Sequence, residues 1–201
     1  MVVGGGEVLV EAIIDRTGAV TRPVLLRSTP PYAEMMLDAI SRWRFRPARA
    51  PEPDGSDAPV EAPVMIAAVY RPPTLFNGPT IGEAPKDLAV ASRDVAYPAT
   101  LVSPVYPPNA LSANASVVLF ELLLDEMGAV REARAIETDP AFEGAARDAL
   151  MQFKFRPGLM RGRAVPSSAY VLFGFRPPVI APGRPNPKPD PEPKPNPKPK
   201  S

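Results

Sequence analysis

The sequence contains neither cysteine nor histidine in its 201 residues. Without cysteine there is no disulfide framework, no thiol nucleophile and no thiolate metal site. Without histidine the chain lacks the side chain that proteins use most often as a general base and as a metal ligand. Both absences argue against an enzyme, and they predict a protein that works without a metal ion or another cofactor.

Long apolar runs are also missing. The longest one, Val117–Leu124, is interrupted by Glu121 and is far shorter than the ~20 apolar residues of a membrane-spanning helix. The first residues carry neither the basic stretch nor the apolar stretch of a signal peptide. Because Met1 falls within a few residues of the first predicted strand, we expect the sequence to be a fragment or to have a misplaced start.

Neither sign of charge dominates, since 23 Lys and Arg stand against 22 Asp and Glu. The residues from Gly183 on carry a net charge of +3, and the rest of the chain carries −2. A nucleic-acid-binding domain has a basic face within its fold. The mildly acidic body therefore predicts no nucleic-acid partner.

Proline, by contrast, is abundant, with 30 residues. Many of them alternate with Asn, Lys, Asp and Glu at the end of the chain, a pattern that cannot bury apolar surface. We predict that residues 181–201 form a disordered tail, extended as polyproline II at ~3.1 Å per residue.

The main feature of the sequence is a segment that occurs twice. An apolar strand leads to an Asp-x-x-Gly turn and a second strand; a helix follows, and Phe-Arg-Pro closes the segment. The turn glycines, Gly18 and Gly128, and the closing phenylalanines, Phe45 and Phe155, are both 110 residues apart. An ungapped repeat of this length indicates two tandem folding units.

Each copy predicts the same order of elements. Apolar alternation gives two strands, an i, i+3, i+4 stripe gives one helix, and a last apolar strand follows. Ser28 or Thr29 is the expected cap of the first helix, with Pro30 or Pro31 in its first turn, and Asp139 is the expected cap of the second. The predicted strands are 7–14, 20–27 and 63–70 in the first copy and 116–124, 129–137 and 170–175 in the second, with a loop at 48–59.

Most charged residues in these motifs have a structural interpretation. Arg46 and Arg156 in the Phe-Arg-Pro segments are expected to be exposed or paired with a local carboxylate. Glu11 and Glu121 each interrupt an apolar strand; they are either a paired site or, as we favour, residues of a solvated strand face. Asp15 and Asp125, which begin the two turns, are expected to have a structural role in the turns alone.

Two segments are candidates for binding a partner. Tyr106-Pro107-Pro108 is either a groove wall for an extended peptide or a rigid lead-in, and the sequence leaves both open. The strand Tyr170–Phe175 carries apolar residues on both faces. If it lies at a sheet edge, its unpaired backbone groups are a template for strand addition by a partner. The alternative is that one repeat pairs with the other.

The order of these motifs resembles the TonB C-terminal domain family. In the second copy the resemblance is carried by Tyr106–Ala110, Asp125–Val130, Phe153–Pro157 and residues 169–175. The first copy matches at Asp15–Val20 and Trp43–Pro47 but lacks the leading Tyr-Pro segment. No single motif is specific, so the resemblance rests on their order, spacing and repetition.

The resemblance implies an α+β fold of two tandem small domains, each a three-stranded antiparallel sheet with one main helix (ββαβ). The boundaries that follow are repeat 1 at 1–73, truncated at its N-terminus, a linker at 74–95, repeat 2 at 96–180 and the Pro/Lys-rich tail at 181–201. It also implies a periplasmic location and, as partners, the outer-membrane TonB-dependent transporters.

In this family the transporter segment adds a strand beside the last strand of the domain, near the Tyr-Pro lead-in. Carried over to this sequence, the expected contact residues are Tyr106, Pro107, Tyr170, Val171, Leu172 and Phe173. A full energy transducer has an N-terminal membrane helix and a spacer ahead of its domain, whereas here the Pro/Lys-rich stretch comes last. Inner-membrane motor proteins are expected partners only if an anchor lies upstream.

The sequence therefore supports two functions of different kinds. The first is a non-enzymatic periplasmic module that binds transporter segments by strand addition. The second is a structural envelope protein whose repeats pair with each other and whose basic tail contacts the cell wall. A free last strand favours the first, and an occluded last strand favours the second. The sequence leaves open whether the chain forms a homodimer.

Overall fold

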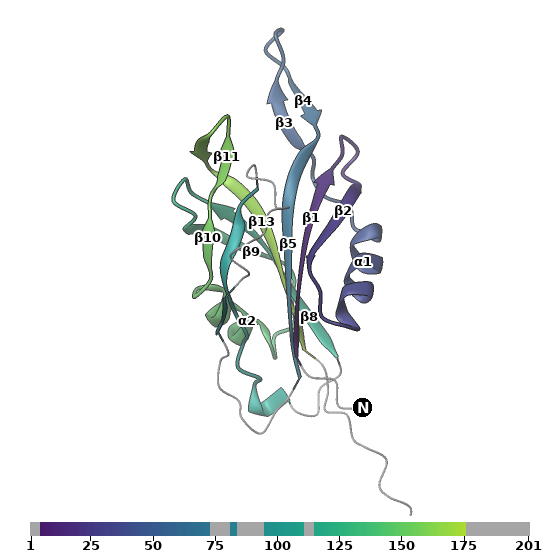
Figure 1. Cartoon of the computed structure of the whole chain (residues 1–201), viewed down its shortest axis with the longest axis vertical. Helices are drawn as coiled ribbons and strands as arrows, with labels where there is room; N and C mark the ends of the chain where they lie inside the picture. The colour runs from purple at the N-terminus through teal and green to yellow at the C-terminus, as the bar shows by residue number, and fades with distance from the viewer. Residues whose placement is uncertain (1–4, 73–80, 84–94, 111–114, 176–201) are drawn as a thin grey trace, which may run out of the picture.

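The computed structural model describes four stretches of the chain, 5–72, 81–83, 95–110 and 115–175. Figure 1 shows an elongated molecule with one long twisted sheet at its centre and a short helix at each side. The predicted tail, and the predicted linker apart from residues 81–83 and Val95, lie outside the described residues.

The strands of the central sheet come from both repeats. The first repeat contributes β1 (Gly6–Ile14), β2 (Val20–Arg27) and β5 (Ala62–Arg71). The second contributes β8 (Ser116–Leu124), β9 (Val130–Glu137) and β13 (Ser167–Phe175). The helices are α1 (Tyr32–Arg42) and α2 (Glu143–Leu150). The mixed α+β class is thus confirmed.

The two repeats share one sheet of six strands in the order β2-β1-β5-β13-β8-β9. The sequence predicts two three-stranded sheets, and the structure joins them edge to edge through their last strands. β5 and β13 run parallel over seven pairs, from Met65–Ala169 to Arg71–Phe175, whereas the other pairs in the sheet are antiparallel. The repeats therefore form the two halves of one body.

The helices lie on opposite faces of this sheet (Figure 1). Side chains alternate between the faces along a strand, and the buried residues separate into two cores accordingly. One core holds the α1 residues Tyr32, Met36 and Ile40; the other holds Phe142 and Leu150 from the α2 side. Equivalent strands can pair in parallel only if the repeats are related by a rotation about the strand direction, which exchanges the faces.

Both hairpin turns are built in the same way. The Oδ1 atom of the first residue accepts hydrogen bonds from the backbone N–H groups two and four residues later, at 2.8 and 3.0 Å for Asp15 and at 2.9 and 2.8 Å for Asp125. In each case the hydrogen bonds lower the pKa of the carboxyl, those from Thr17 and Ala129 contributing most. The predicted structural role of the two aspartates is confirmed.

The turn glycines explain why the Phe-Arg-Pro motif accompanies the turn in both copies. Gly18 and Gly128 have φ of +84° and +78°, which L side chains rarely adopt. A Cβ at either position would lie 2.0 or 2.1 Å from the carbonyl oxygen of Phe45 or Phe155. The closing segment after each helix therefore rests directly on the turn of the first hairpin.

Smaller sheets extend the fold beyond the predictions. The predicted loop at 48–59 is wrong, because its ends pair as the hairpin β3 (Ala48–Pro51) and β4 (Asp57–Val60). β11 (Gly158–Met160) pairs with β12 (Arg163–Val165). A three-stranded sheet has the order β10-β7-β6 and consists of β10 (Lys154–Arg156), β7 (Tyr97–Val102) and β6 (Ile81–Glu83). β7 precedes the Tyr106-Pro107 lead-in in the chain, and β6 lies within the predicted linker.

The helix boundaries differ in part from the predictions. Thr29 does not cap α1 with its side chain; its hydroxyl bonds the backbone N and O of Glu7 in β1 instead, at 3.2 and 3.0 Å. The predicted cap of the second helix is also wrong, because the N-cap of α2 is Phe142, without a side-chain cap hydrogen bond. Asp139 Oδ1 accepts the N–H of Ala141 at 3.0 Å in the turn before the helix. α1 ends at Arg42, with Trp43 extended, before the Phe-Arg-Pro segment begins.

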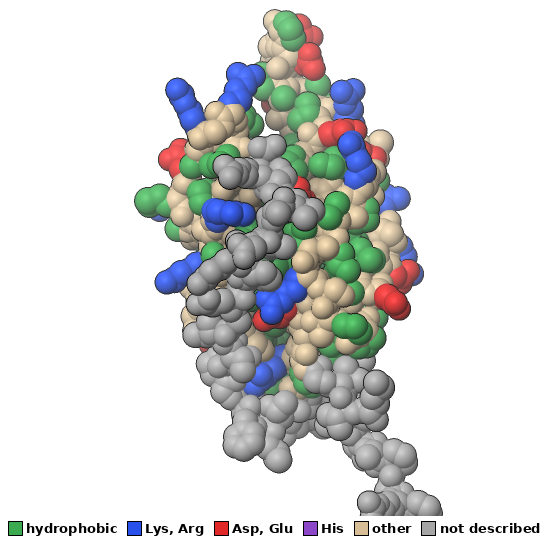
Figure 2. All heavy atoms as spheres, in the orientation of Figure 1, with side chains coloured by type: hydrophobic (Ala, Val, Ile, Leu, Met, Phe, Trp, Pro, Cys, Tyr) green, Lys and Arg blue, Asp and Glu red, His purple; other side chains and the backbone are tan. Residues whose placement is uncertain are grey.

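Within the described stretches, no helix is long and apolar enough to cross a membrane. Figure 2 shows one face of the molecule, on which described Lys and Arg side chains are mixed with acidic and hydrophobic ones and form no single basic patch.

Candidate partner-binding site

The predicted docking strand, β13, lies inside the sheet and not at its edge. It pairs with β8 from Ser167–Leu124 to Phe175–Ser116 and with β5 on its other side. Val171 and Phe173 are fully buried. In this state the edge of β13 expected to receive a transporter segment is occupied by the last strand of the first repeat.

The two faces of β13 serve the two cores. Val171 and Phe173 belong to the core under α2, whereas Tyr170 and Leu172 belong to the core under α1. A central strand covered on both faces is apolar on both faces. This explains why Tyr170–Phe175 carries apolar residues on both faces, and it agrees with the alternative that one repeat pairs with the other.

The other predicted part of the site, Tyr106 and Pro107, meets β13 only at its C-terminal end. Tyr106 is 1% exposed, and its ring lies 5.9 Å from Phe175 and 5.5 Å from Phe142. Burial raises the pKa of the Tyr106 hydroxyl. Tyr106 therefore anchors the lead-in to the α2 core, in line with the rigid lead-in that the sequence left open.

Pro107, in contrast, lines a surface hollow of about 410 Å³ between the lead-in and α2. The hollow is bordered by small or apolar residues, Pro104, Val105, Pro140, Ala141, Gly144 and Ala145 among them. Pro107 is therefore part of the wall of a hollow on the α2 side, which agrees with the other interpretation of the Tyr-Pro lead-in.

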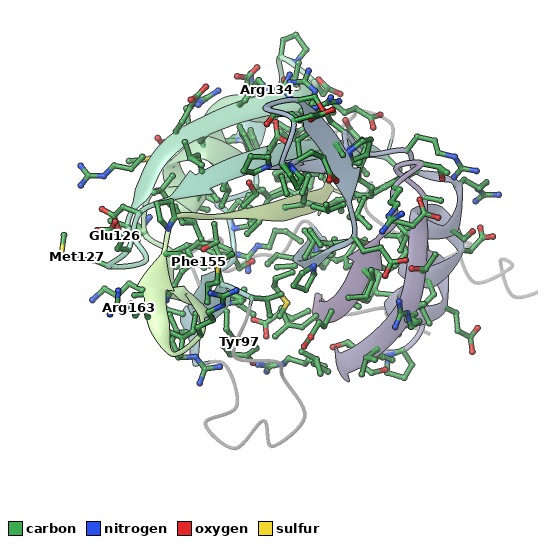
Figure 3. All side chains as sticks on the ribbon, turned by 90° about the horizontal axis from the view of Figure 1, so that it is seen from above. Tyr97, Glu126, Met127, Arg134, Phe155 and Arg163 are labelled. Carbon is green, nitrogen blue, oxygen red and sulfur yellow. The ribbon has the colours of Figure 1, made fainter. Side chains whose placement is uncertain are left out.

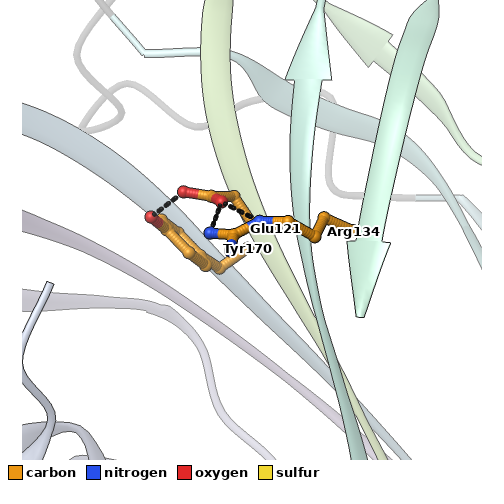
Figure 4. Close-up of polar contacts among 3 residues, drawn as sticks. All are labelled: Glu121, Arg134 and Tyr170. Atoms are coloured by element: carbon orange, nitrogen blue, oxygen red, sulfur yellow. Dashed lines mark hydrogen bonds and ion pairs between the residues drawn. The ribbon is translucent and has the colours of Figure 1, made fainter. Parts of the chain in front are cut away.

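A polar cluster that the sequence did not predict lies next to β13 (Figure 4). The Tyr170 hydroxyl donates to Glu121 Oε1 at 2.7 Å, and Arg134 Nε donates to Oε2 of the same carboxylate at 3.0 Å. Burial alone would raise the pKa of Glu121, but these hydrogen bonds and the charges of Arg134 and Arg46 lower it. Burial, followed by the bond to Glu121, raises the pKa of Tyr170.

This cluster forms one wall of a groove of about 420 Å³. The opposite wall is the segment after α1, from Trp43 to Arg46. The ring of Phe45 lies 4.7 Å from that of Tyr170, edge on, so the two repeats meet at the base of the groove. Arg46 and Arg156 are both exposed, as predicted. The sequence contains no signal for this groove, because its walls come from different repeats.

The described residues include no group of three or more acidic side chains placed to hold a metal ion. What the second half of the chain offers is an antiparallel β8-β9 hairpin, a helix and a last strand, preceded by a Tyr-Pro lead-in. Residues 102–177 match the family described as Gram-negative bacterial TonB protein C-terminal. Residues 102–177 belong to the TonB C-terminal family. The resemblance seen in the second copy is thereby confirmed.

The TonB match begins at the end of β7 and includes the whole β8-β9-α2-β13 unit. The first repeat lies outside it. No curated protein matches the chain. The TonB C-terminal family consists of protein-interaction domains, and membership implies a TonB-like role in TonB-dependent transport.

Proposed function

We propose that this protein is a non-enzymatic periplasmic module that binds a segment of an outer-membrane TonB-dependent transporter by strand addition. The proposed receptor is the edge of β13 that β5 covers in this state, with Tyr170, Val171, Leu172 and Phe173 opposite the added strand. Tyr106 and Pro107 would border the end of that edge.

One observation carries this proposal. β5 lies along β13 as an extended parallel strand over seven residue pairs. This edge of a TonB-family domain is therefore competent to hold an added strand, and here the strand comes from the same chain. A transporter segment would replace β5 and make equivalent backbone hydrogen bonds, so main-chain pairing is exchanged and not lost.

Exchange also has an unfavourable side. β5 is buried on both faces, and Met65, Ile66 and Ala68 are at most 1% exposed. Releasing β5 exposes such side chains to water, and this exposure costs about 25 cal/mol of free energy per Å² of apolar area. We therefore expect weak binding of an isolated transporter peptide, and tighter binding wherever the pairing of the repeats is loosened.

The absence of cysteine provides a direct test. Ala67 and Val171 are paired residues on β5 and β13 and face the same core. Neighbouring strands lie about 4.8 Å apart, within the range of Cα separations that a disulfide spans, so Ala67→Cys with Val171→Cys introduces a cysteine pair that can be oxidised. The full-length double variant, oxidised and reduced, is titrated with N-terminal peptides of the transporters of the same organism, and binding is measured by NMR.

The proposal expects binding to the reduced protein and none to the oxidised protein. Binding to both the oxidised and the reduced protein would show that the transporter segment does not bind at the β13 edge. Absence of binding in both states, from a folded sample, would contradict the transporter-binding function.

The occupied edge also favours the second function. If β5 never leaves β13, the pair of repeats is a fixed body, as expected of a structural envelope protein. Binding of the full-length chain to isolated cell wall, lost on removal of residues 181–201, would support this alternative. Motor proteins would become partners only if an anchor lies upstream.

A further inference from the structure

The pseudo-symmetry of the repeats gives each face of the sheet an equivalent set of residues. On the α2 face of repeat 1, Leu9 is fully buried in the same core as Val95, Ala96 and Leu101, which belong to the segment around β7. The matching face of repeat 2 is the one beneath the groove that Trp43–Arg46, Glu121 and Arg134 line. By this equivalence, a segment like the one around β7 is expected over that face of repeat 2.

The described residues cover this face of repeat 2 incompletely. Leu123 and Ile136 are 46% and 47% exposed, although their counterparts 110 residues earlier, Ile13 and Leu26, are half-buried. Ile136 lines the groove, whereas Leu123 lies further along β8, opposite Glu132. Within the groove, Ile136 is thus a large aliphatic side chain that the described residues leave open to water.

Repeat 2 shows what occupies the equivalent position in the fold. There the closing strand β10 pairs antiparallel with β7, with Lys154 opposite Thr100 and Arg156 opposite Tyr97. The guanidinium of Arg156 also lies 5.1 Å from the centre of the Tyr97 ring. Figure 3 shows Tyr97 and Phe155 close together, with Arg134 on the opposite side of the molecule.

In repeat 1 the equivalent closing segment has no such strand. Phe45 N donates to Gly18 O at 2.8 Å, which ties one side of the segment to the turn. Apart from the single bridge of Arg44 to Ala19 in that turn, no described strand pairs with residues 43–46. The backbone beside the groove is therefore a short free edge.

Charge indicates the kind of segment that fits. Arg44 and Arg46 line the groove and are exposed, and neither forms an ion pair with a described residue. The carboxylate of Glu121 is already paired with Arg134 and accepts a hydrogen bond from the Tyr170 hydroxyl. Arg44 and Arg46 therefore favour an incoming strand with carboxylates opposite them. The chain's own tail does not fit this description, because its net charge is positive.

The geometry points to this groove as a second strand-acceptor site, which takes an extended peptide of a partner protein with apolar residues alternating with carboxylates. The peptide would pair with residues 44–46 as β7 pairs with β10, and its apolar side chains would cover Ile136. The site uses the Tyr170 side chain at its base but not the backbone edge of β13. Because its walls come from different repeats, it exists while β5 is paired with β13.

Trp43 makes the site directly observable, because it lines the groove and is the single tryptophan of the chain. The probe is a synthetic peptide of residues 95–104 of this chain with Tyr97→Glu and Thr100→Glu, which places carboxylates opposite Arg46 and Arg44. The control peptide has lysine at both positions. Full-length protein with the β5–β13 disulfide is titrated, so that the β13 edge stays closed.

We expect a saturable change in Trp43 emission with the acidic peptide and at least tenfold weaker binding of the lysine peptide. Arg46→Glu should weaken the acidic peptide by a similar factor, whereas Arg16→Glu, in the exposed turn of the same repeat, should not. An unaltered unfolding midpoint shows that either variant is folded.

Three results would overturn the inference. One is no saturable change in emission up to millimolar peptide. Another is equal affinity for both peptides and for Arg46→Glu. The third is displacement of the acidic peptide by a peptide of residues 181–201, which would make the tail the occupant. None of these results bears on transporter binding, which is measured separately at β13.

Discussion

The two copies of the repeat differ most in what covers their closing Phe-Arg-Pro segments. In the second copy β7 pairs with β10, and Phe153 and Phe155 are each 6% exposed. In the first copy no strand of the described residues lies beside the corresponding segment as β7 does, and Trp43 and Phe45 are half-buried. The same motif is therefore core in one copy and the wall of a groove in the other.

This difference shows how a duplicated unit can acquire a second role. Each copy has the same turn glycine, helix and closing phenylalanine. β7 lies outside the repeated unit. It covers the closing segment of the second copy by pairing with β10. The first copy also supplies β5 to the edge of the second, so the repeats complete each other at one edge and leave one face open.

The largest effect is expected where the copies are alike. Gly128→Ala places a methyl group 2.1 Å from the Phe155 carbonyl oxygen at a φ of +78°, and it should lower the free energy of unfolding by about 3 kcal/mol or more. The matched control is Gly162→Ala, which has a similar φ of +79° and nothing within 4 Å, and should lose only ~1–2 kcal/mol. Urea denaturation measures both; equal losses would mean that the close approach is unimportant.

The next effect separates the copies. Phe155→Ala removes a buried ring and should destabilise the protein by ~3–5 kcal/mol. Phe45→Ala removes its half-buried counterpart, so we expect about half of that loss. The same denaturation experiment applies. Similar losses would imply that the Phe45–Tyr170 contact replaces the missing cover and that the groove is not an open surface.

A smaller effect concerns the uncovered face. Leu123→Thr alters a side chain that is 46% exposed and should change the free energy of unfolding by no more than ~0.5 kcal/mol. Ile13→Thr, its counterpart in the first copy, should cost at least twice as much, because that side chain is half-buried. A large loss at Leu123 would show that the face is covered in solution.

The smallest effect is the pH dependence of the Glu121 cluster, which has no equivalent in the first copy because Met65 pairs with Glu11 where Tyr170 pairs with Glu121. The folded-state pKa of Glu121 is lowered from 4.5. Its contribution to stability is thus present above pH 4.5 and is lost as the pH falls through the folded-state value. Glu121→Gln should flatten that decline in unfolding scans between pH 5 and 3, and an unchanged slope would exclude the contribution.

Local patterns predicted the elements well. The Asp-x-x-Gly turns and the apolar alternation yielded both hairpins, because turn chemistry and strand period are set by neighbouring residues. Errors arose where a more distant partner intervenes. Thr29 bonds Glu7 in β1 and does not cap its helix, and residues 48–60 form a hairpin although their composition is typical of a loop.

The candidate site was predictable only in part. The apolar character of Tyr170–Phe175 follows from its sequence, but an edge strand that binds a partner and a central strand covered on both faces look the same there. Likewise, Glu121 reads as an interruption of an apolar strand, whereas its partners, Arg134 and Tyr170, lie 13 and 49 residues away.

The sequence by itself determined that two similar units would form, each with its strands, helix and closing segment, because these depend on short-range patterns that occur twice. The tertiary structure alone decided how the units combine. The parallel pairing of β5 with β13 joins them into one sheet and places their helices on opposite faces. Among the described strands, it leaves none beside the groove at Trp43–Arg46. The physical reason is that sheet edges pair through backbone groups common to all residues, so the choice of partner depends on which buried faces and edges are left free.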